Sequence, residues 1–241
     1  MTHYPTFENM TKSIEVVGVQ VENQPKPAYK ITFRNLSDKN LRALRVDVKS
    51  NGRPASSGVW QGEEGRSLIE PGGTAKRYLG VLTSQRTATG FVPSAASANT
   101  IVIRTAVFTD MSVEGELEPA CQIESVLMGR RLWLQEVLPF LDREVAVPIE
   151  DHIEAARQFK EKFSALSYEF DEKERNRASS MAGCPKPFKL AQGGPSIFKL
   201  QVLHDLDEII TTRPSPPVNF KSWLETRRAA YQAWLARLQQ N

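Results

Sequence analysis

Residues 29–48 read Tyr29-Lys-Ile-Thr-Phe-Arg-Asn-Leu-Ser-Asp-Lys-Asn-Leu-Arg-Ala-Leu-Arg-Val-Asp-Val48. Apolar residues occupy every second position in Tyr29–Phe33 and again in Leu44–Val48. This alternation predicts two strands of an antiparallel sheet, with one face toward the core and one toward water. Between them, Asn35–Asn40 is rich in side chains that hydrogen-bond their own backbone, which predicts a turn.

The same pattern extends over residues Ser13 to Asp110. Ile14–Val21 and Thr100–Phe108 are rich in β-branched residues, which favours central strands. Asn51-Gly52 and Pro71-Gly72-Gly73 predict sharp turns, because asparagine and glycine tolerate a positive φ. The stretch from Ser84 to Asn99 is expected to be a long loop or an irregular edge. Short strands at this spacing predict a β-sandwich of about seven strands.

The stretch Tyr29–Val48 resembles the middle hairpin of immunoglobulin-like or fibronectin-III-like domains of uncharacterised bacterial envelope proteins. Ile69–Gly72 and Ala106–Asp110 fit the same pattern. The resemblance ends near Asp110 and covers none of the remainder, and this half lacks the cysteines of antibody domains. It implies an immunoglobulin-like fold for residues 13–112, in a domain that binds something or acts as a spacer.

Beyond Asp110 the apolar residues recur at helical spacing. The pattern predicts about four helices: one from Pro119 to a kink or end at Pro139, one from Pro148 to about Phe170, one from the N-cap Ser196 to about Ile210, and one that starts near Asn219 or Ser222. We therefore predict an α+β chain with an antiparallel sandwich at 1–112 and a helical region at 113–241. Residues 178–195, rich in Gly, Ser and Pro, are expected to form an exposed loop.

The composition restricts the class of protein. The chain has 241 residues, of which 40% are hydrophobic and 24% charged, as in ordinary folded soluble proteins. A net charge of +3 argues against a nucleic-acid binder. No apolar run approaches the roughly 20 residues that span a bilayer. We therefore expect no nucleic-acid partner and no transmembrane segment.

The cysteines and the N-terminus leave alternatives open. Cys121 and Cys184 form no C-x-x-C pair, which argues against a structural zinc site. They are either two free thiols or one disulfide, which would close a loop of about 60 residues. The first residues do not resemble a signal peptide. Of a cytoplasmic protein and an exported or periplasmic one whose leader has been removed, we favour the exported one.

The sequence contains no familiar catalytic motif. It lacks Gly-x-Ser-x-Gly, His-Glu-x-x-His and the glycine-rich phosphate-binding loops. His152 and His204 have acidic neighbours, but solvated helix faces explain both clusters. Asp110, Ser112 and Glu114 alternate like the ligands of a calcium loop, yet its twelfth position, which needs a glutamate, is Cys121. We expect no cofactor and no metal.

Five aromatic residues are the candidate binding residues. Trp60 and Tyr78 could stack on a sugar ring if both lie exposed on a sheet, and Trp223, Tyr231 and Trp234 form an aromatic stripe that could dock on a partner. For all five, burial in the core is the competing interpretation. The leading hypothesis is a non-enzymatic protein-binding or structural module of a bacterial protein, associated with the cell envelope. The alternatives are a carbohydrate-binding accessory domain and an enzyme with a site assembled from dispersed residues.

Overall fold

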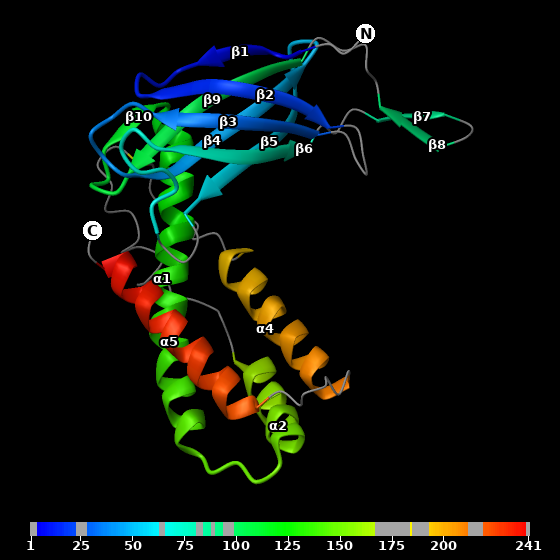
Figure 1. Ribbon diagram of the computed structural model, residues 1–241, viewed down its shortest axis with the longest axis vertical. Coiled ribbons are helices and arrows are strands. Elements are labelled where there is room, and N and C mark those ends of the chain that lie inside the picture. Colours follow the sequence, from blue (N-terminus) through cyan, green and yellow to red (C-terminus); the bar gives the residue numbers. More distant parts are fainter. Residues whose placement is uncertain are drawn as a thin grey trace. The chain divides into compact units, whose positions relative to one another are not determined.

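The structure is a computed structural model, which describes residues 4–22, 28–62, 66–80, 84–87, 90–93, 99–166, 184, 193–211 and 219–239. Its strands precede its helices along the chain, which confirms the α+β class (Figure 1). The chain divides into two compact units, Met1–Ile123 and Glu124–Gln240. Eight strands of the first unit form two sheets, close to the seven strands expected.

The larger sheet has the order β1-β9-β4-β5, with β10 also paired to β9. Its strands are β1 (Thr6–Asn9), β4 (Leu41–Ser50), β5 (Arg53–Gln61), β9 (Asn99–Phe108) and β10 (Val113–Gly115). The prediction of a purely antiparallel sandwich is wrong for one strand, because β1 pairs with β9 in parallel. The β-branched stretch Thr100–Phe108 is indeed a central strand, with β4 on one side and β1 and β10 on the other.

The smaller sheet has the order β2-β3-β6 and is antiparallel throughout. Its strands are β2 (Ile14–Glu22), β3 (Ala28–Asn35) and β6 (Thr74–Gly80). The expectation of a central strand over Ile14–Val21 is wrong, because β2 is an edge strand of this sheet. The predicted alternation is confirmed on β3, where Tyr29, Ile31 and Phe33 are buried. These side chains and those of Leu44, Val46 and Val48 on β4 belong to one hydrophobic cluster, so the two sheets share a core.

The backbone angles confirm the predicted turns. Asn51 and Gly52 have φ angles of 50° and 75° and join β4 to β5. Two positive φ angles in succession are the signature of the tight hairpin turn that the Asn-Gly pair predicts. Gly72, at the corner before β6, has φ 69°. The expectation for Ser84 to Asn99 is wrong in part, because β7 (Ser84–Thr87) and β8 (Gly90–Pro93) form a hairpin.

Four helices follow in the described residues: α1 (Leu117–Ala146), α2 (His152–Ala165), α4 (Gly193–Thr211) and α5 (Phe220–Gln239). Pro139 does not end the first helix, which continues to Ala146. An internal proline costs about 3 kcal/mol, and burial of the flanking Val137, Phe140 and Leu141 compensates for that cost.

Two other helix starts differ from the sequence-based boundaries, and the start of α5 agrees with its prediction. α2 begins at His152 rather than Pro148, because the Asp151 carboxylate accepts hydrogen bonds from the backbone N–H groups of Ile153 and Glu154. α4 begins at Gly193, ahead of the predicted N-cap and inside the predicted loop at 178–195; apart from Cys184, the rest of that loop lies outside the described residues. Asn219 accepts from the N–H of Ser222 and caps α5.

Candidate functional site

Trp60 faces the core from the larger sheet, whereas Tyr78 lies on the outer side of the smaller sheet. Trp60 on β5 pairs with the buried Leu44, is partly buried itself and packs its ring 5.4 Å from that of Phe33 in the shared core. Tyr78 on β6 is 55% exposed and pairs with Lys30, whose Nζ lies 5.4 Å from the centre of the tyrosine ring. The two rings therefore do not form a common flat platform for a sugar.

Tyr78 belongs to the outer face of the β2–β3–β6 sheet. Directly opposite residues of antiparallel strands point to the same side, so the register places four rows on this face. One is Glu22–Ala28–Gly80, at the end of the strands, and three others follow it. They are Gln20–Lys30–Tyr78, Gly18–Thr32–Lys76 and Glu15–Arg34–Thr74. We call these three rows the basic face.

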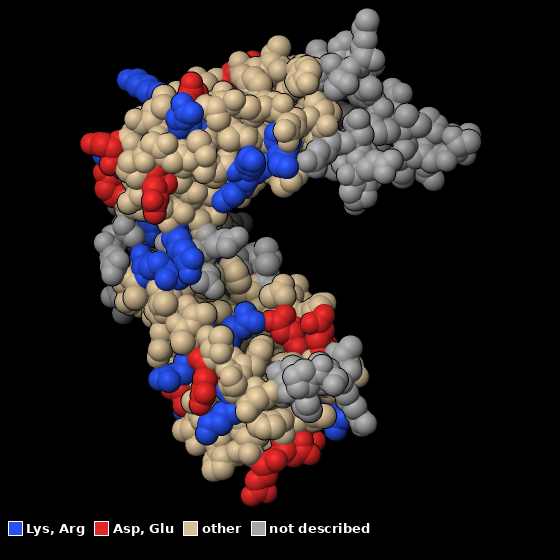
Figure 2. Space-filling view, viewed as in Figure 1, with Lys and Arg blue, Asp and Glu red and all other residues tan. Residues whose placement is uncertain are grey.

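Three cations and one carboxylate occupy the basic face. The carboxylate, Glu15, lies 3.5 Å from the Arg34 guanidinium, and both side chains are 46% exposed. Lys76 is exposed as well. Cationic side chains are visible on the strand-bearing unit in the space-filling view (Figure 2). Tyr78 is thus an exposed aromatic ring beside lysine side chains on the outer face of this sheet.

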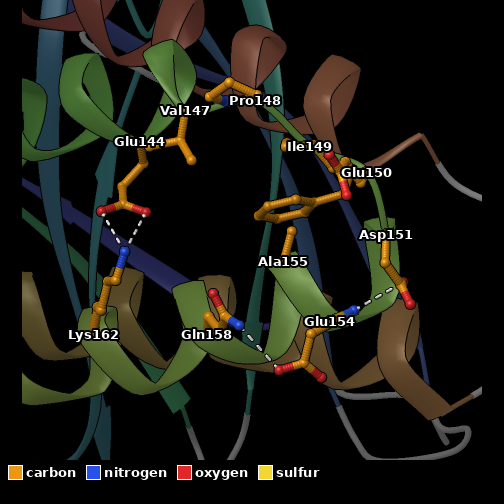
Figure 3. Close-up of a pocket in the computed structure, with 11 residues that line it drawn as sticks. Glu144, Val147, Pro148, Ile149, Glu150, Asp151, Glu154, Ala155, Gln158 and Lys162 are labelled. Carbon is orange, nitrogen blue, oxygen red and sulfur yellow. Dashed lines mark hydrogen bonds and ion pairs between the residues drawn. The ribbon is translucent and has the colours of Figure 1, made fainter.

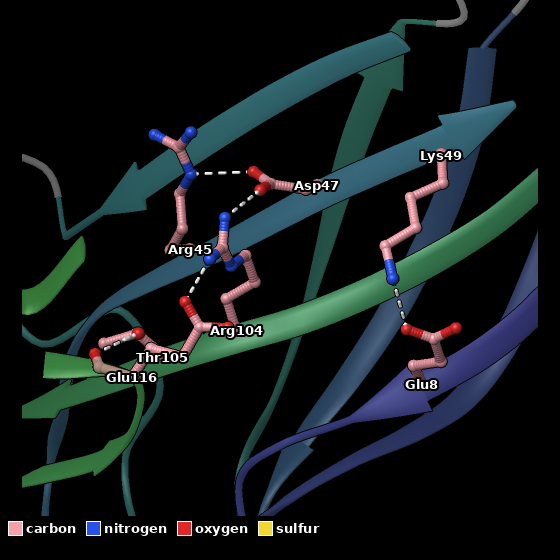
Figure 4. A network of polar contacts seen from close by, with 7 residues as sticks. All are labelled: Glu8, Arg45, Asp47, Lys49, Arg104, Thr105 and Glu116. Atoms are coloured by element: carbon pink, nitrogen blue, oxygen red, sulfur yellow. Dashed lines mark hydrogen bonds and ion pairs between the residues drawn. The ribbon is translucent and has the colours of Figure 1, made fainter. Parts of the chain in front are cut away.

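The outer face of the larger sheet has a different electrostatic character (Figure 4). Asp47 accepts hydrogen bonds from Arg45 at 2.8 Å and from Arg104 at 3.0 Å. Arg104 also donates to Glu116, and these two carboxylates raise the pKa of Arg104. At the β1 end, Lys49 donates to Glu8 at 2.7 Å. In this network three cations meet three carboxylates, so the charges balance within it.

The predicted calcium-loop residues turn toward different partners. Asp110 lies 2.7 Å from Lys39 Nζ and accepts from Ser112, and these contacts lower its pKa to about 2. Glu114 instead accepts from the backbone N–H groups of Lys12 and Ser13 and from the Ser13 hydroxyl. In the part of the chain that the structure describes, no group of three His, Cys, Asp or Glu side chains is arranged to hold a metal ion.

The hydrogen bonds to Glu114 are expected to stabilise the folded state at neutral pH and to lose that effect in acid. Burial alone raises its pKa, but the hydrogen bonds from Ser13 and Lys12 outweigh burial and lower it. A lowered pKa means that the stabilisation is complete above the ordinary pKa of about 4.5 and is lost as the pH falls through the folded-state value. Glu114→Gln should therefore lower the free energy of unfolding by about 1–2 kcal/mol at pH 7 and have little effect near pH 2.

Urea unfolding at pH 7 and at pH 2 measures this difference. The control is Glu70→Gln, since Glu70 is an exposed glutamate in the same unit. It should change stability by less than about 0.5 kcal/mol at either pH. An equal loss for Glu114→Gln at both values would show that its hydrogen bonds do not depend on the charge.

The aromatic stripe of the fourth helix lies mostly inside the helical unit. Tyr231 and Trp234 are 5% and 3% exposed. The Tyr231 ring lies 5.3 Å from Trp133, and the Trp234 ring 4.7 Å from Phe198. Trp223 is partly buried, stacks on Phe220 at 5.7 Å and lies under the Arg227 guanidinium. These contacts assign the stripe to helix packing, which leaves little of it for a partner.

Ion pairs connect the four helices in ways that the sequence did not indicate. Glu144 on α1 accepts two hydrogen bonds from Lys162 on α2, and Lys160 on α2 donates to Asp207 on α4. Arg227 and Arg228 on α5 pair with Asp205 on α4 and Asp142 on α1. Each pair joins a different two helices, so these ion pairs link all four helices of this unit.

The two histidines that neighbour carboxylates occupy different helices. His152 is the first residue of α2, and its buried Nδ1 has no hydrogen-bond partner among the described residues. His204 on α4 is 68% exposed and lies 3.9 Å from Glu208, one turn further along the same helix.

A hollow of about 250 Å³ lies at the connection between α1 and α2 (Figure 3). Val147, Pro148, Ala155 and Phe220 form part of its lining, together with several carboxylates. Those of Glu144 and Glu154 bind Lys162 and Gln158. The Asp151 carboxylate caps α2, and the backbone N–H groups of Glu154 and Ile153 lower its pKa. The contacts of Glu144, Glu154 and Asp151 thus connect the end of α1 with α2 and cap the start of α2.

Cys121 and Cys184 are both disulfide-bonded, and because the chain has only two cysteines they are joined to each other. This resolves the alternative that the sequence left open, and the interpretation as free thiols is wrong. Cys121 lies in the first turns of α1 with 2% of its surface exposed. Cys184 is partly buried.

None of the helices, over the residues that are described, is long and apolar enough to cross a membrane. Comparisons with protein-family models, with curated proteins and with solved structures find no match.

Proposed function

We propose that this chain is a non-enzymatic binding or structural module of a bacterial protein, located outside the cytoplasm, and that its partner is another protein. The observation that carries the proposal is Tyr78, more than half exposed on the outer face of the β2–β3–β6 sheet. Large aromatic side chains mostly bury their area, and tyrosine is among the residues that dominate protein interfaces. Tyr78 is therefore the proposed centre of the contact.

The strand order supports an immunoglobulin-like fold for the first unit. One sheet contains β2, β3 and β6, and the other contains β5, β4 and β9 in that order. Immunoglobulin-like sandwiches divide their strands between two antiparallel sheets in a similar manner. In this interpretation β10 and β1 together occupy the position next to β9 where the last strand of such a domain lies.

The disulfide supports a location outside the cytoplasm. Disulfides form and persist in oxidising compartments such as the bacterial periplasm, and they are rare where thioredoxin and glutathione keep thiols reduced. The bond between Cys121 and Cys184 therefore favours export, in agreement with a module of the cell envelope.

A photo-crosslinking experiment tests the proposed function. The full chain carries p-benzoylphenylalanine in place of Tyr78 and is irradiated in the cells that produce it. We expect a discrete adduct of higher mass, because a residue at the centre of an interface lies against the partner. The control has the same amino acid in place of Val59, which is 40% exposed on β5 and pairs with Arg45 on the other outer face.

Comparison of the two positions distinguishes a specific interface from non-specific binding. An adduct at position 78 that is saturable and missing at position 59 supports the proposal. The proposal is wrong if position 78 gives no adduct, or if both positions give the same set of adducts.

A further inference from the structure

The hollow at the connection between α1 and α2 combines an apolar lining with a charged rim (Figure 3). Its apolar lining residues are Val147, Pro148, Ile149, Ala155 and Phe220. Phe220 is buried, whereas Val147 has 47% of its surface exposed. An aliphatic group that entered the hollow would therefore cover valine surface that the chain itself leaves in water, which is favourable.

The charged lining consists of four carboxylates and one ammonium group. Lys162 donates two hydrogen bonds of 3.0 Å to Glu144, so this pair is neutral. Glu154 accepts a hydrogen bond from Gln158 and lies 3.6 Å from Arg157, a cation outside the lining. With Arg157 included, the carboxylates still exceed the cations by two.

The two carboxylates in excess are those of Glu150 and Asp151, which are both exposed. Among the described residues, no lysine, arginine or histidine forms an ion pair with either of them. Asp151 caps α2 with Oδ1 alone, so Oδ2 remains available to a ligand. In Figure 3 both residues lie on the side of the hollow opposite Glu144 and Lys162, away from the lysine that lines it.

From this arrangement we infer that the hollow binds an arginine side chain of a partner protein. Arginine has an aliphatic stem below a charged head, so the stem would lie against Val147 and Ala155 while the head meets Glu150 and Asp151. The guanidinium group presents five N–H donors in a fork, which suits two adjacent carboxylates. The inference goes beyond the contact proposed at Tyr78 and does not depend on it.

The size of the hollow favours a single side chain. Pockets that enclose small-molecule ligands measure roughly 300–1,000 Å³, and this hollow of about 250 Å³ is smaller. One side chain that projects from a protein surface needs less room than such a ligand, because its backbone stays outside.

Other occupants fit the hollow less well. An anion would meet the excess of carboxylates, and the first N–H groups of α2, which could attract it, already donate to Asp151. A wholly apolar side chain would remove water from the carboxylates without a compensating hydrogen bond. A metal ion lacks ligands, because no three His, Cys, Asp or Glu side chains in the described ranges are arranged to hold one.

The test is an NMR titration of the full, disulfide-intact, ¹⁵N-labelled chain. The probe is Nα-acetylarginine methylamide, which presents one arginine side chain without terminal charges. We expect saturable shifts of the backbone amides of residues 150–155, with a Kd on the order of 1 mM for a ligand of this size. The citrulline analogue has nearly the same shape without the charge and should bind about tenfold more weakly, because it gives Glu150 and Asp151 no cation.

Two variants test the two parts of the site. Ala155→Leu fills the hollow without a change in charge, and Glu150→Gln removes a carboxylate that does not cap α2; each should weaken binding of the arginine probe about five- to tenfold. The matched control, Glu161→Gln, removes an exposed carboxylate of α2 that does not line the hollow, and should weaken binding less than about twofold. Circular dichroism establishes that the variants are folded, and Ala155→Val replaces Ala155→Leu if that variant is not.

The outcomes keep this inference separate from the proposed function. Absence of saturable shifts, equal binding of the citrulline analogue, or equal effects of Glu150→Gln and Glu161→Gln would overturn the site. Binding of free L-arginine about tenfold tighter than that of the blocked probe would overturn the assignment to a protein side chain, because the free amino acid would then be the better ligand. The crosslink at position 78 is an independent measurement, so either proposal can fail while the other holds.

Discussion

Removal of the disulfide should be one of the two most destabilising changes to this chain. Cys121 and Cys184 are joined to each other. In the chain-entropy model, opening a loop of about 60 residues stabilises the unfolded state by about 4 kcal/mol. That is a large fraction of the roughly 5–15 kcal/mol of a typical folded domain. Cys121→Ser/Cys184→Ser should therefore lower the unfolding temperature by roughly 10 °C in a thermal melt.

A reducing agent supplies the matched control. Dithiothreitol should lower the unfolding temperature of the unchanged chain by a similar amount and leave the double variant where it is, because the variant has no bond to reduce. A drop of less than about 2 °C in the unchanged chain, with complete reduction verified by thiol titration, would contradict the prediction. It would also weaken the inference that the chain is located in an oxidising compartment, because that inference depends on a disulfide that matters to the folded protein.

Local patterns in the sequence were sufficient to predict the strands that form the core. The alternation in Tyr29–Phe33 and Leu44–Val48 predicted the correct buried faces because a strand exposes every second residue to the same side. The pair Asn51-Gly52 was sufficient to predict the turn between β4 and β5, because few residue pairs tolerate two positive φ angles. The parallel pairing of β1 was not predictable in this way, because it joins segments far apart in the chain, such as Thr6 and Thr100, and leaves all of β1 exposed.

The candidate site shows the same limit. The alternation in β3 placed Lys30, Thr32 and Arg34 on one outward face, but the sequence did not show which side chains of β2 and β6 lie beside them. A sequence pattern also cannot distinguish Trp60 from Tyr78, because each is an isolated aromatic in a polar stretch. Only the register, which pairs one with Leu44 and the other with Lys30, separates a core residue from a surface residue.

In the helical unit the spacing of apolar residues predicted the helices but not the contacts between them. Asp205, one of the acidic neighbours of His204, was interpreted as part of a solvated face because its partner, Arg227, lies on another helix. Pro139 predicted a break because its local cost is large, but burial on both sides of it outweighs that cost. Tertiary contacts therefore decide these features, and they act over separations that a window of sequence does not cover.

Gly115→Ala should also destabilise the first unit strongly. Gly115 ends β10 with φ +87°, a conformation that residues with a side chain rarely adopt. A Cβ atom at this position would lie 2.0 Å from the backbone carbonyl oxygen of Arg104 on β9. Strain and overlap with a backbone atom together should lower the free energy of unfolding by about 3–5 kcal/mol in urea unfolding.

Gly52→Ala separates the two causes. Gly52 has a similar φ of +75°, but a Cβ there would meet nothing within 4 Å, so this variant has the backbone strain without the overlap. It should cost about 1 kcal/mol, and the difference between the two variants measures how tightly β10 lies on β9. If the variants lose the same amount, the overlap at Gly115 is relieved by a shift of β10. Because α1 begins directly after β10, such a shift would also move the start of that helix, and hydrogen exchange at Arg104–Ala106 would report the loosened pairing.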